Sequence, residues 1–376
     1  MANYQLWLTD DRGYKLEMIN QFNSLVYIIT PSNLGWFTLS VPYDRESMAA
    51  DWRRPDRQIH IYRAPNGGDL AREAIYFIQK WRFYDRGGDA MMDISGAGLN
   101  DILNRRIVAY YAESAQSQMT SVPADDMMKR LVNDALGSDS NTDYDGAIIT
   151  GRDVESFGFS IQAESSGGAS ISKAFAWRGL LPTLKAIKDQ TRVEVEEVFF
   201  DIVPTGIAPL TCEFRTYIGK RGSDRTRASN SPLRFGREWG NVDRATMSID
   251  YSKLQNHIYV GGKGRFEDRI IEEVKDGGSE ALSVWARREG FLNNQSTDDT
   301  SLLTASGNTR LAEKARDVRF SASIKDTPYS PYGGKGWRAG DKITISYLGR
   351  DIDAIIRSVR VTVDNRGEKI MGSVSV

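Results

Sequence analysis

Histidine, the side chain that most often transfers protons at neutral pH, occurs twice in this chain of 376 residues, as His60 and His257. Two isolated histidines provide no pair at metal-binding spacing, and no Ser-His-Asp array can be assembled around either of them. His60 lies between Ile59 and Ile61 in an alternating run, which predicts a solvent-facing position on a strand. The histidines therefore indicate no acid–base catalysis.

Three neighbouring glutamates could suggest the paired carboxylates of a glycosidase. Glu194 and Glu196 alternate with Val193 and Val195, and Glu197 follows. Alternate residues of a strand point to opposite faces, so Glu194 and Glu196 would share the outer face of a strand that buries the valines. The pattern predicts a charged exterior, and two carboxylates facing each other across a cleft are the less favoured interpretation.

A run of oxygen-bearing side chains, Asp139 to Gly146, resembles a calcium-binding loop. Its sixth position is Tyr144, where such a loop requires glycine, and its twelfth is Thr150, where it requires a bidentate glutamate. The run therefore predicts an acidic solvated turn. Gly334 and Gly336 match part of a dinucleotide fingerprint, but the sequence predicts neither the strand before them nor the helix after them. The sequence indicates no metal site and no cofactor.

The single cysteine, Cys212, allows no internal disulfide and no thiolate metal cluster. It lies in the strand-like run Thr211 to Gly219, which predicts a buried, inert thiol. Because these residues assemble into no catalytic constellation, we expect a protein without enzymatic activity.

Composition and charge are those of an ordinary folded protein, with 40% hydrophobic and 26% charged residues. The length exceeds what one core serves and predicts roughly two to four domains. A formal net charge of -1 gives no overall field that would attract nucleic acid or an anionic membrane. Met1 to Lys15 lacks the apolar core of a signal peptide, and no apolar run approaches the roughly 20 residues of a membrane span. We expect synthesis in the cytoplasm and no membrane span.

The elements that would position these residues begin with strands. Short runs of strand character in the first hundred residues are Tyr4 to Leu8, Leu25 to Thr30, Trp36 to Val41, Ile59 to Arg63, Ala74 to Tyr84 and Met91 to Ser95. Turn formers such as Asn66 to Gly68 and Arg86 to Gly88 separate several of them. This spacing predicts a small antiparallel barrel or sandwich over residues 1–97.

Helical spacing appears after residue 97. Leu99 to Leu103 has a short helical repeat, and Pro123 to Leu136 predicts a second helix, with acidic residues near its amino end and an apolar stripe. Leu180 to Lys188 predicts a third helix, which leads into a strand from Val193 to Ile202. Residues 98–210 are therefore expected to form a mixed α/β domain.

Three runs of alternating apolar and polar residues lie between Gly340 and Val376, separated by turn sequences at Gly349 to Asp351 and Asp364 to Gly367. A period of two predicts an antiparallel meander with one buried face. The strand signature also returns at Thr211 and continues to Gly262.

Between these strand-rich parts lies a charged segment rich in Ser, Thr and Asn, whose clearest helical stretch is Leu311 to Val318. We interpret residues 264–319 as a peripheral, partly helical insertion. A second β-barrel domain, split into 211–263 and 320–376, would surround it. The predicted fold is α+β and β-rich, with two small antiparallel β-barrel domains, the mixed α/β domain and this insertion.

The segment Arg215 to Arg237 carries seven basic residues against one acidic residue, Asp224. Nucleic-acid contact is one interpretation. The richness of Gly222 to Pro232 in Ser, Thr, Asn and Gly favours an exposed loop, which in functional form would dock an acidic protein surface. The candidate docking residues are Arg221, Arg225 and Arg227. The acidic stretch Pro123 to Asp145 of a neighbouring subunit is the candidate complement.

Three of these segments together resemble the tail hub proteins of long-tailed bacteriophages. The first is the strand-to-helix junction Ser95 to Arg106, the second is Asn256 to Gly262, and the third is Gly340 to Ile345 with the meander after it. The residues that carry the match are Gly96, Leu99, Leu103, Arg105, Asn256, Val260, Gly261, Gly340 and Asp341. Their order and spacing cover most of the chain.

The resemblance implies a homotrimer at the tail tip of a virion, in which two barrels per chain give six positions around a ring. Such a ring joins the sixfold tail tube and the distal tail ring to a spike or fibre, contacts the tape measure protein and surrounds the channel through which viral DNA leaves. Since the chain ends with its last strand, we expect the short form without an enzymatic or fibre domain at the carboxyl end. A carbohydrate-binding or receptor-binding tail module and, less favoured, a cell-wall hydrolase are the alternatives.

Overall fold

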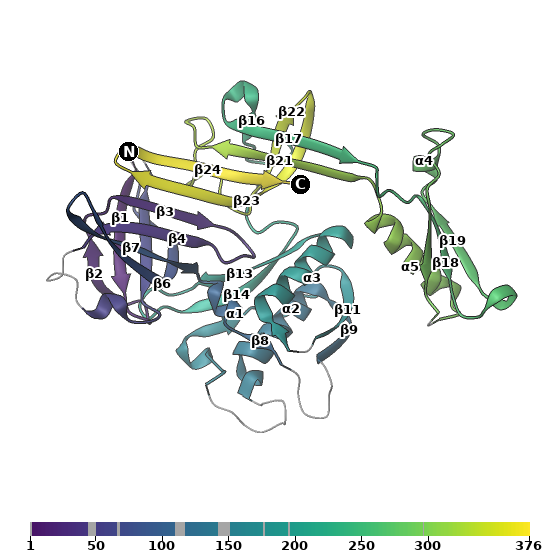
Figure 1. The fold of residues 1–376 in the computed structure, drawn as a ribbon, viewed down its shortest axis with the longest axis horizontal. Helices are drawn as coiled ribbons and strands as arrows, with labels where there is room; N and C mark the ends of the chain where they lie inside the picture. The colour runs from purple at the N-terminus through teal and green to yellow at the C-terminus, as the bar shows by residue number, and fades with distance from the viewer. Residues whose placement is uncertain are drawn as a thin grey trace. The chain divides into compact units, whose positions relative to one another are not determined.

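The computed structural model describes residues 2–43, 50–65, 68–109, 117–141, 151–175, 177–194, 196–295 and 297–376. The chain divides into two compact units (Figure 1). Unit 1 comprises Met1–Arg244 and Ala322–Val376, and unit 2 comprises Ala245–Ser321. The strand-rich composition confirms the expected β-rich α+β fold.

The first part of unit 1 is an antiparallel sheet in the order β3-β4-β7-β6-β5-β1-β2. Its strands are β1 (Asn3–Thr9), β2 (Lys15–Ile19), β3 (Ser24–Ile29), β4 (Trp36–Pro42), β5 (Gln58–Ala64), β6 (Ala71–Arg86) and β7 (Asp89–Gly98). Alternate residues such as Leu6, Leu25 and Phe37 are fully buried, as a period of two requires. The strands predicted here are confirmed, and β2 is an additional edge strand.

The predicted meander at the carboxyl end is also confirmed. It consists of β22 (Lys342–Tyr347), β23 (Arg350–Asp364) and β24 (Gly367–Ser375), each antiparallel to the next. Two short strands, β15 (Asp224–Arg225) and β16 (Arg234–Gly236), pair with β22 in parallel. The sheet continues beyond β24 through β21 (Asp317–Lys325) to β17 (Val242–Asp250).

Backbone pairing joins the two strand-rich parts of unit 1 into one sheet. Strand β23 pairs with β24 on one side and with β3 on the other, so that Val361 lies opposite Tyr27. Side chains then connect strands that are distant in this order, because Arg63 on β5 donates to Glu368 on β24 at 2.7 and 3.0 Å. The sheet therefore curls until β5 and β24 approach each other. The two separate barrels remain a prediction.

The mixed α/β part lies between these strand-rich parts in the sequence. Its elements are α1 (Asp101–Asn104), β8 (Ile107–Val108), β9 (Ser117–Pro123), α2 (Ala124–Leu136), β10 (Phe159–Ile161), β11 (Ser170–Phe175), β12 (Arg178–Gly179), α3 (Leu180–Glu194), β13 (Val198–Pro204) and β14 (Cys212–Ile218). Helix α2 has the predicted bounds, with acidic residues in its first turn and a buried apolar stripe. Helix α3 starts as predicted and extends to Glu194.

Five short 3-10 helices complete the described elements: η1 (Ala50–Arg53), η2 (Ser138–Asn141), η3 (Glu155–Phe157), η4 (Arg237–Trp239) and η5 (Phe266–Asp268). The calcium-like run Asp139 to Gly146 falls partly on η2 and otherwise on residues outside the described ranges.

Unit 2 is a three-stranded sheet with a helix packed on one face. Its elements are β18 (His257–Gly261), β19 (Ile271–Lys275), α4 (Gly277–Glu280), β20 (Glu289–Asn293) and α5 (Thr300–Glu313), with β18 in the centre. Asp299 caps α5 by accepting a hydrogen bond from the Ser301 amide at 2.8 Å. This cap sets the helix start earlier than the predicted stretch from Leu311 to Val318. The compact unit also begins at Ala245 rather than 264, since β18 pairs with β19 and β20.

Candidate functional site

The first sequence motif, Ser95 to Arg106, forms the end of β7 and helix α1. Gly96 lies where β7 approaches β6 so closely that an added Cβ would be 1.8 Å from the Phe77 carbonyl oxygen. The register of the two strands shifts at the same place, between Ile78 and Lys80. Leu99 and Leu103 then bury their side chains in the core of the α/β part. The motif therefore serves a close backbone contact and the packing after it.

Arg105 closes this junction through two carboxylates. Its Nε donates to Asp101 at 2.7 Å and its Nη1 donates to Asp56 at 2.5 Å, while Gln79 donates to Asp101 at 2.8 Å. The guanidinium also lies over the Phe77 ring, 4.9 Å from its centroid. Burial alone would lower the pKa of Arg105, but its hydrogen bonds to Asp101 and Asp56 raise it. Arg105 thus ties helix α1 to the turn that precedes β5.

The second motif places a buried amide at the start of β18. The Asn256 side chain accepts a hydrogen bond from the Arg288 amide at 2.7 Å and donates to the Ala286 carbonyl at 2.8 Å. Val260 belongs to the core of unit 2. A Cβ added to Gly261 would meet the Arg269 guanidinium at 2.5 Å. Asn256 therefore fixes the loop before β20, and Gly261 makes room for an arginine.

The third motif is a turn that holds separate segments together. Gly340 has a φ of +91°, which favours glycine. The Asp341 carboxylate is buried and accepts hydrogen bonds from the Ser223 amide at 2.6 Å and the Arg338 amide at 2.8 Å. Burial raises the pKa of Asp341 even though these amides act in the opposite direction. The turn also receives a backbone bond from Ile356. Each of the three motifs therefore holds separate segments of the chain together.

The structure brings two of the three candidate docking residues into contact with acidic groups of the same chain. Arg221 lies 3.0 Å from Asp201, whose pKa is raised by its burial although Arg221 acts to lower it. Arg227 pairs with Asp351 at the surface. Arg225 lies on β15 and is half-buried. Their docking role stays a prediction, but Arg221 and Arg227 each already pair with a carboxylate of the same chain.

Two acidic residues of the predicted complement are committed to contacts within the chain, while Asp134 is half-buried, Asp139 is exposed and the complement itself stays a prediction. Asp125 and Asp126 are buried, and the Lys129 ammonium donates to Asp125 at 2.9 Å. The same two carboxylates accept hydrogen bonds from backbone amides of residues 165–167. They therefore hold a loop onto the first turn of α2. Asp143 and Asp145 lie outside the described residues.

Two expectations about polar residues are also wrong, namely the solvent-facing position of His60 and the strand position of Glu194. His60 is fully buried rather than solvent-facing, and its ring lies 2.9 Å from the Gln58 side chain. Burial lowers the pKa of His60 to about 4. Glu197 is buried as well, because Arg357 pairs with it at 2.7 Å and Lys188 at 3.3 Å. Glu196 is exposed, as expected, and Glu194 ends α3 instead of lying on a strand.

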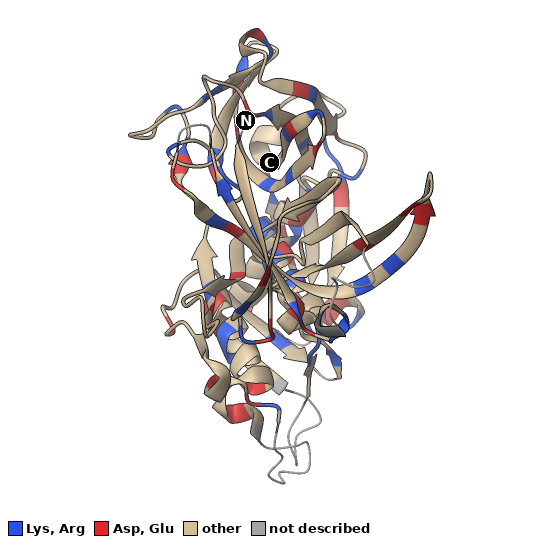
Figure 2. Ribbon diagram, turned by 90° about the vertical axis from the view of Figure 1, so that its left-hand side faces the viewer, with Lys and Arg blue, Asp and Glu red and all other residues tan. Residues whose placement is uncertain are grey.

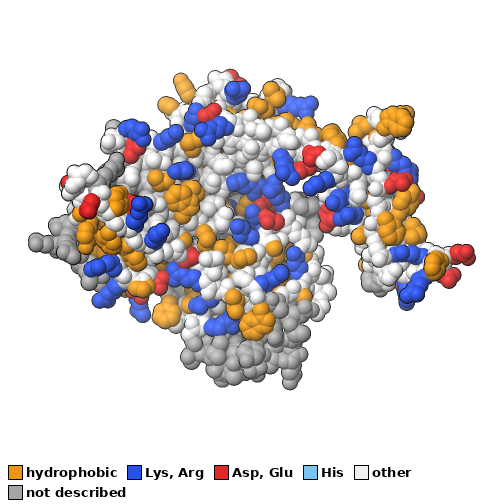
Figure 3. All heavy atoms as spheres, viewed as in Figure 1, with side chains coloured by type: hydrophobic (Ala, Val, Ile, Leu, Met, Phe, Trp, Pro, Cys, Tyr) orange, Lys and Arg blue, Asp and Glu red, His pale blue; other side chains and the backbone are white. Residues whose placement is uncertain are grey.

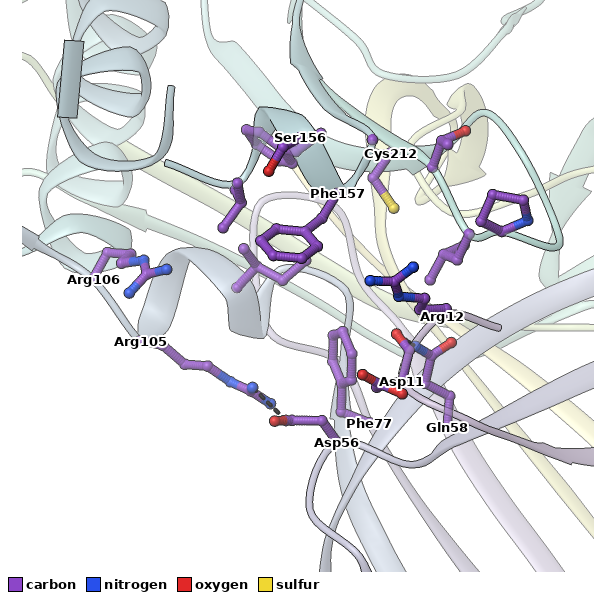
Figure 4. A pocket seen from close by; sticks show the side chains of 17 residues that line it. Asp11, Arg12, Asp56, Gln58, Phe77, Arg105, Arg106, Ser156, Phe157 and Cys212 are labelled. Atoms are coloured by element: carbon purple, nitrogen blue, oxygen red, sulfur yellow. Dashed lines mark hydrogen bonds and ion pairs between the residues drawn. The ribbon is translucent and has the colours of Figure 1, made fainter. Parts of the chain in front are cut away.

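A cavity of about 670 Å³ lies in unit 1 between the first sheet and the α/β part (Figure 4). Its apolar lining includes Phe77 and Phe157, and Arg12, Arg105 and Arg106 lie around the same space. The pKa of Arg106 is lowered by its burial and by neighbouring arginines. The cavity offers positive charge beside apolar surface. No motif marks it in the sequence, because its lining comes from several distant segments.

Cys212 lines this cavity as a buried thiol, so the predicted burial is confirmed. Burial raises the pKa of the thiol to about 12, which leaves almost no thiolate at neutral pH. The predicted lack of reactivity is consistent with this environment.

The second histidine is buried in unit 2, where its Nδ1 lies 2.6 Å from Glu280 and its Nε2 lies 2.7 Å from Glu273. Within the described ranges, no group of three or more His, Cys, Asp or Glu side chains is placed to hold a metal ion. None of the helices in these ranges has both the length and the apolar character needed to cross a bilayer. Figure 2 shows basic and acidic residues interspersed along the same elements.

The matches to known proteins cover nearly the whole chain. The family model described as Siphovirus ReqiPepy6 Gp37-like protein matches residues 4–372. The 43 kDa tail protein of prophage MuSo2 from Shewanella oneidensis has a similar structure, with 12% identity and a TM-score of 0.54 over 99% of this chain and 97% of that one. A tail protein from Neisseria meningitidis MC58 gives 12% identity and 0.54 over 99% and 96%. A search of curated proteins found no match. The chain has the fold of these tail proteins.

Proposed function

The chain belongs to the Siphovirus ReqiPepy6 Gp37-like protein family, and from this membership we propose that it is a structural hub protein of a bacteriophage tail and a component of the virion. Three copies would form a ring at the tail tip. This ring would connect the tail tube and the distal tail ring to the spike or fibre, contact the tape measure protein and surround the DNA channel.

The observation that carries the proposal is the agreement in fold with two phage tail proteins over nearly the entire length of each chain. The construction of unit 1 supports it. Its two strand-rich parts share backbone pairing at β23 and β3 and a buried ion pair between Arg63 and Glu368. A ring that transmits load between a tube and a spike needs protomers that do not hinge, and a continuous curled sheet resists bending between its halves.

The mass of the purified chain in solution tests the ring directly. Light scattering coupled to size exclusion should give three times the 42.1 kDa of one chain, and negative-stain images should show threefold rings. A monomer at every concentration, or rings of another symmetry, would contradict the trimer. Immunogold labelling of intact virions should place the protein at the tail tip.

The alternatives from the sequence make different predictions for the same preparation. A carbohydrate-binding module should give specific signals on a glycan array. A hydrolase should release soluble fragments from purified peptidoglycan. Either result would move the assignment away from a purely structural hub.

The basic segment from Arg215 to Arg237 remains our proposed docking site for a neighbouring tail protein. Arg227 is the member of the set suited to a test, since its side chain is exposed and its partner Asp351 also lies at the surface. Arg227→Glu should leave the trimer intact and reduce the yield of complete tails from an infected culture. Complete tails at the wild-type yield would argue against docking through this residue. Arg221 is unsuitable because reversing it would place a second carboxylate beside buried Asp201.

A further inference from the structure

Unit 2 exposes more large apolar side chains than it buries. Its core cluster consists of Ile258, Val260, Val274 and Leu303. Large apolar side chains at its surface include Phe266, Ile271, Leu282, Val284, Trp285 and Phe291, and Figure 3 shows hydrophobic side chains along this unit from the end that carries α4 to the β18–β19 hairpin. A unit with so small a core gains stability when a partner covers such a surface.

The face of the unit 2 sheet opposite helix α5 is only partly covered. Helix α5 packs on the face that carries Val260 and Val274, and Gly307 allows close approach because a Cβ there would be 2.3 Å from Val274. Register places Phe291 beside Tyr259, and Ile271 beside Gly261, on the opposite face. His257 on this face is fully buried beside Glu280. Phe291 and Ile271 remain about half exposed although the Arg269 guanidinium lies over the Phe291 ring.

The most exposed apolar side chains lie on the loop between α4 and β20. Leu282 is 72%, Val284 91% and Trp285 88% exposed. The loop nevertheless has a fixed shape, since the buried Asn256 side chain binds the backbone at Ala286 and Arg288. A preformed loop loses little conformational entropy on binding, so its apolar side chains contribute most of their burial energy to association. This is the arrangement of a docking element.

The charges around the loop favour a protein partner over a lipid surface. Three basic residues, Lys275, Arg287 and Arg288, are balanced by three acidic residues, Asp276, Glu280 and Glu289, and Arg287 pairs with Glu289 at 2.7 Å. Binding to anionic lipid requires a positive excess beside the apolar groups. A rim of both signs around an apolar centre is typical of protein interfaces.

The amount of apolar surface points to a second copy of this chain. An aromatic side chain buries roughly 150–250 Å² in an interface, so three aromatic and three aliphatic groups approach the roughly 800 Å² per partner of a standard complex. A surface of this kind must be covered soon after folding, and another copy is always present. The net charge of -1 opposes self-association very little.

We propose that unit 2 docks onto a second copy of the chain, with Trp285 on the loop between α4 and β20 as the anchor. This inference rests on the proposed trimer and adds the element that holds it together. In a closed threefold ring each contact joins two different surfaces, so the loop meets a surface of the next copy other than its own equivalent.

The test compares variants of the full chain by light scattering over a concentration series. Trp285→Ala should raise the trimer dissociation constant by about 30-fold or more, as expected for a central aromatic anchor. Leu282→Ser combined with Val284→Ser should act in the same direction. Tyr329→Ala is the matched control, because Tyr329 is an equally exposed aromatic residue of unit 1, and it should leave the trimer unchanged. Circular dichroism should show the same fold for every variant, since each altered side chain is exposed.

Each outcome has a distinct meaning. A wild-type trimer that Trp285→Ala leaves unchanged overturns the docking proposal while the proposed hub function stands. A wild-type chain that stays monomeric overturns the trimer and the docking proposal together. Equal weakening by Tyr329→Ala overturns the assignment to the loop. Flotation of the wild-type chain, but not of Trp285→Ala, with vesicles of phosphatidylethanolamine and phosphatidylglycerol would assign the loop to a membrane and overturn the proposal.

Discussion

The ion pair between Arg63 and Glu368 gives a quantitative test of how the sheet of unit 1 closes. Their side chains are 4% and 14% exposed, and two hydrogen bonds of 2.7 and 3.0 Å join them. The Tyr4 hydroxyl donates to the same carboxylate. Glu368→Gln keeps the size of this side chain but removes its charge, so the guanidinium stays in place without a counter-ion.

Breaking a buried pair by removing one partner costs about 3–5 kcal/mol. The lower end applies here, because Glu368 retains some contact with water and Arg63 also lies 5.2 Å from the centroid of the Tyr332 ring. We therefore expect the free energy of unfolding of unit 1 to fall by about 3 kcal/mol. With a urea slope of about 3 kcal/mol per molar, the unfolding midpoint should fall by about 1 M.

The chain provides a matched control in the pair of Arg130 and Glu164, which has the same shortest distance of 2.7 Å but side chains 45% and 47% exposed. A surface pair contributes about 0–1 kcal/mol and is screened by salt, so Glu164→Gln should shift the midpoint by about 0.3 M or less. Urea titrations followed by tryptophan fluorescence, in low salt and in 1 M NaCl, give both shifts. Equal shifts for the two variants would refute the view that the buried pair closes the sheet.

Three further predictions concern single sites. Gly96→Ala should destabilise unit 1 by about 1–3 kcal/mol or prevent folding, because the added Cβ would overlap the Phe77 carbonyl. The control Gly277→Ala, at a position with open space around it, should change the thermal midpoint little. A stable Gly96→Ala protein would disprove the close approach of the two strands. Cys212, with a thiol pKa of about 12, should resist Ellman's reagent at pH 8 until urea unfolds the chain, and rapid labelling of the native protein would show that the thiol is accessible. His60 has a folded pKa near 4 against an ordinary value of 6.5, so the unfolded state binds more protons between these pH values. The free energy of unfolding should therefore fall by up to about 3 kcal/mol as the pH drops from 6.5 to 4. His60→Leu should remove this part of the pH dependence of the urea midpoint, and identical profiles for both proteins would contradict the prediction.

Local sequence signals predicted the elements in which several signals agree. Helix α2 combines acidic residues in the first turn with a full apolar stripe, and its bounds were predictable within a residue. The carboxyl-terminal meander was equally clear, since apolar and polar residues alternate along most of β22 to β24 and turn sequences separate the strands. Both depend on residues within about ten positions of each other, which is the range over which period and turn chemistry act.

The wrong predictions concern which face of an element is covered. His60 alternates with isoleucines, and a period of two assigns it to the opposite face, but that face is buried as well. Glu197, to which the alternation assigned no outer position, is buried and pairs with Arg357, which lies 160 positions away in the sequence. A charged residue that is buried with a distant partner has the same local sequence as an exposed one. Contacts of this range cannot be derived from spacing.

The boundary of unit 2 was displaced for a related reason. The run that becomes β18 has the strand character of the main sheet, and it was assigned to that sheet. Its actual neighbours, β19 and β20, are short strands within the charged segment that resembled an insertion. Strand character is a property of a segment, whereas the choice of a partner strand depends on the whole fold.

The distribution of polar and apolar groups suits a protein that assembles with other subunits. In the described residues, the buried carboxylates with shifted pKa values, such as Asp201 and Asp341, are bound to amides or arginines that join segments of the chain. The large groups left for partners are apolar, and Trp285 is held outward by a loop that Asn256 fixes from inside. The buried polar groups named here thus connect segments of the chain, while large apolar side chains are exposed. This distribution is suited to forming contacts between subunits.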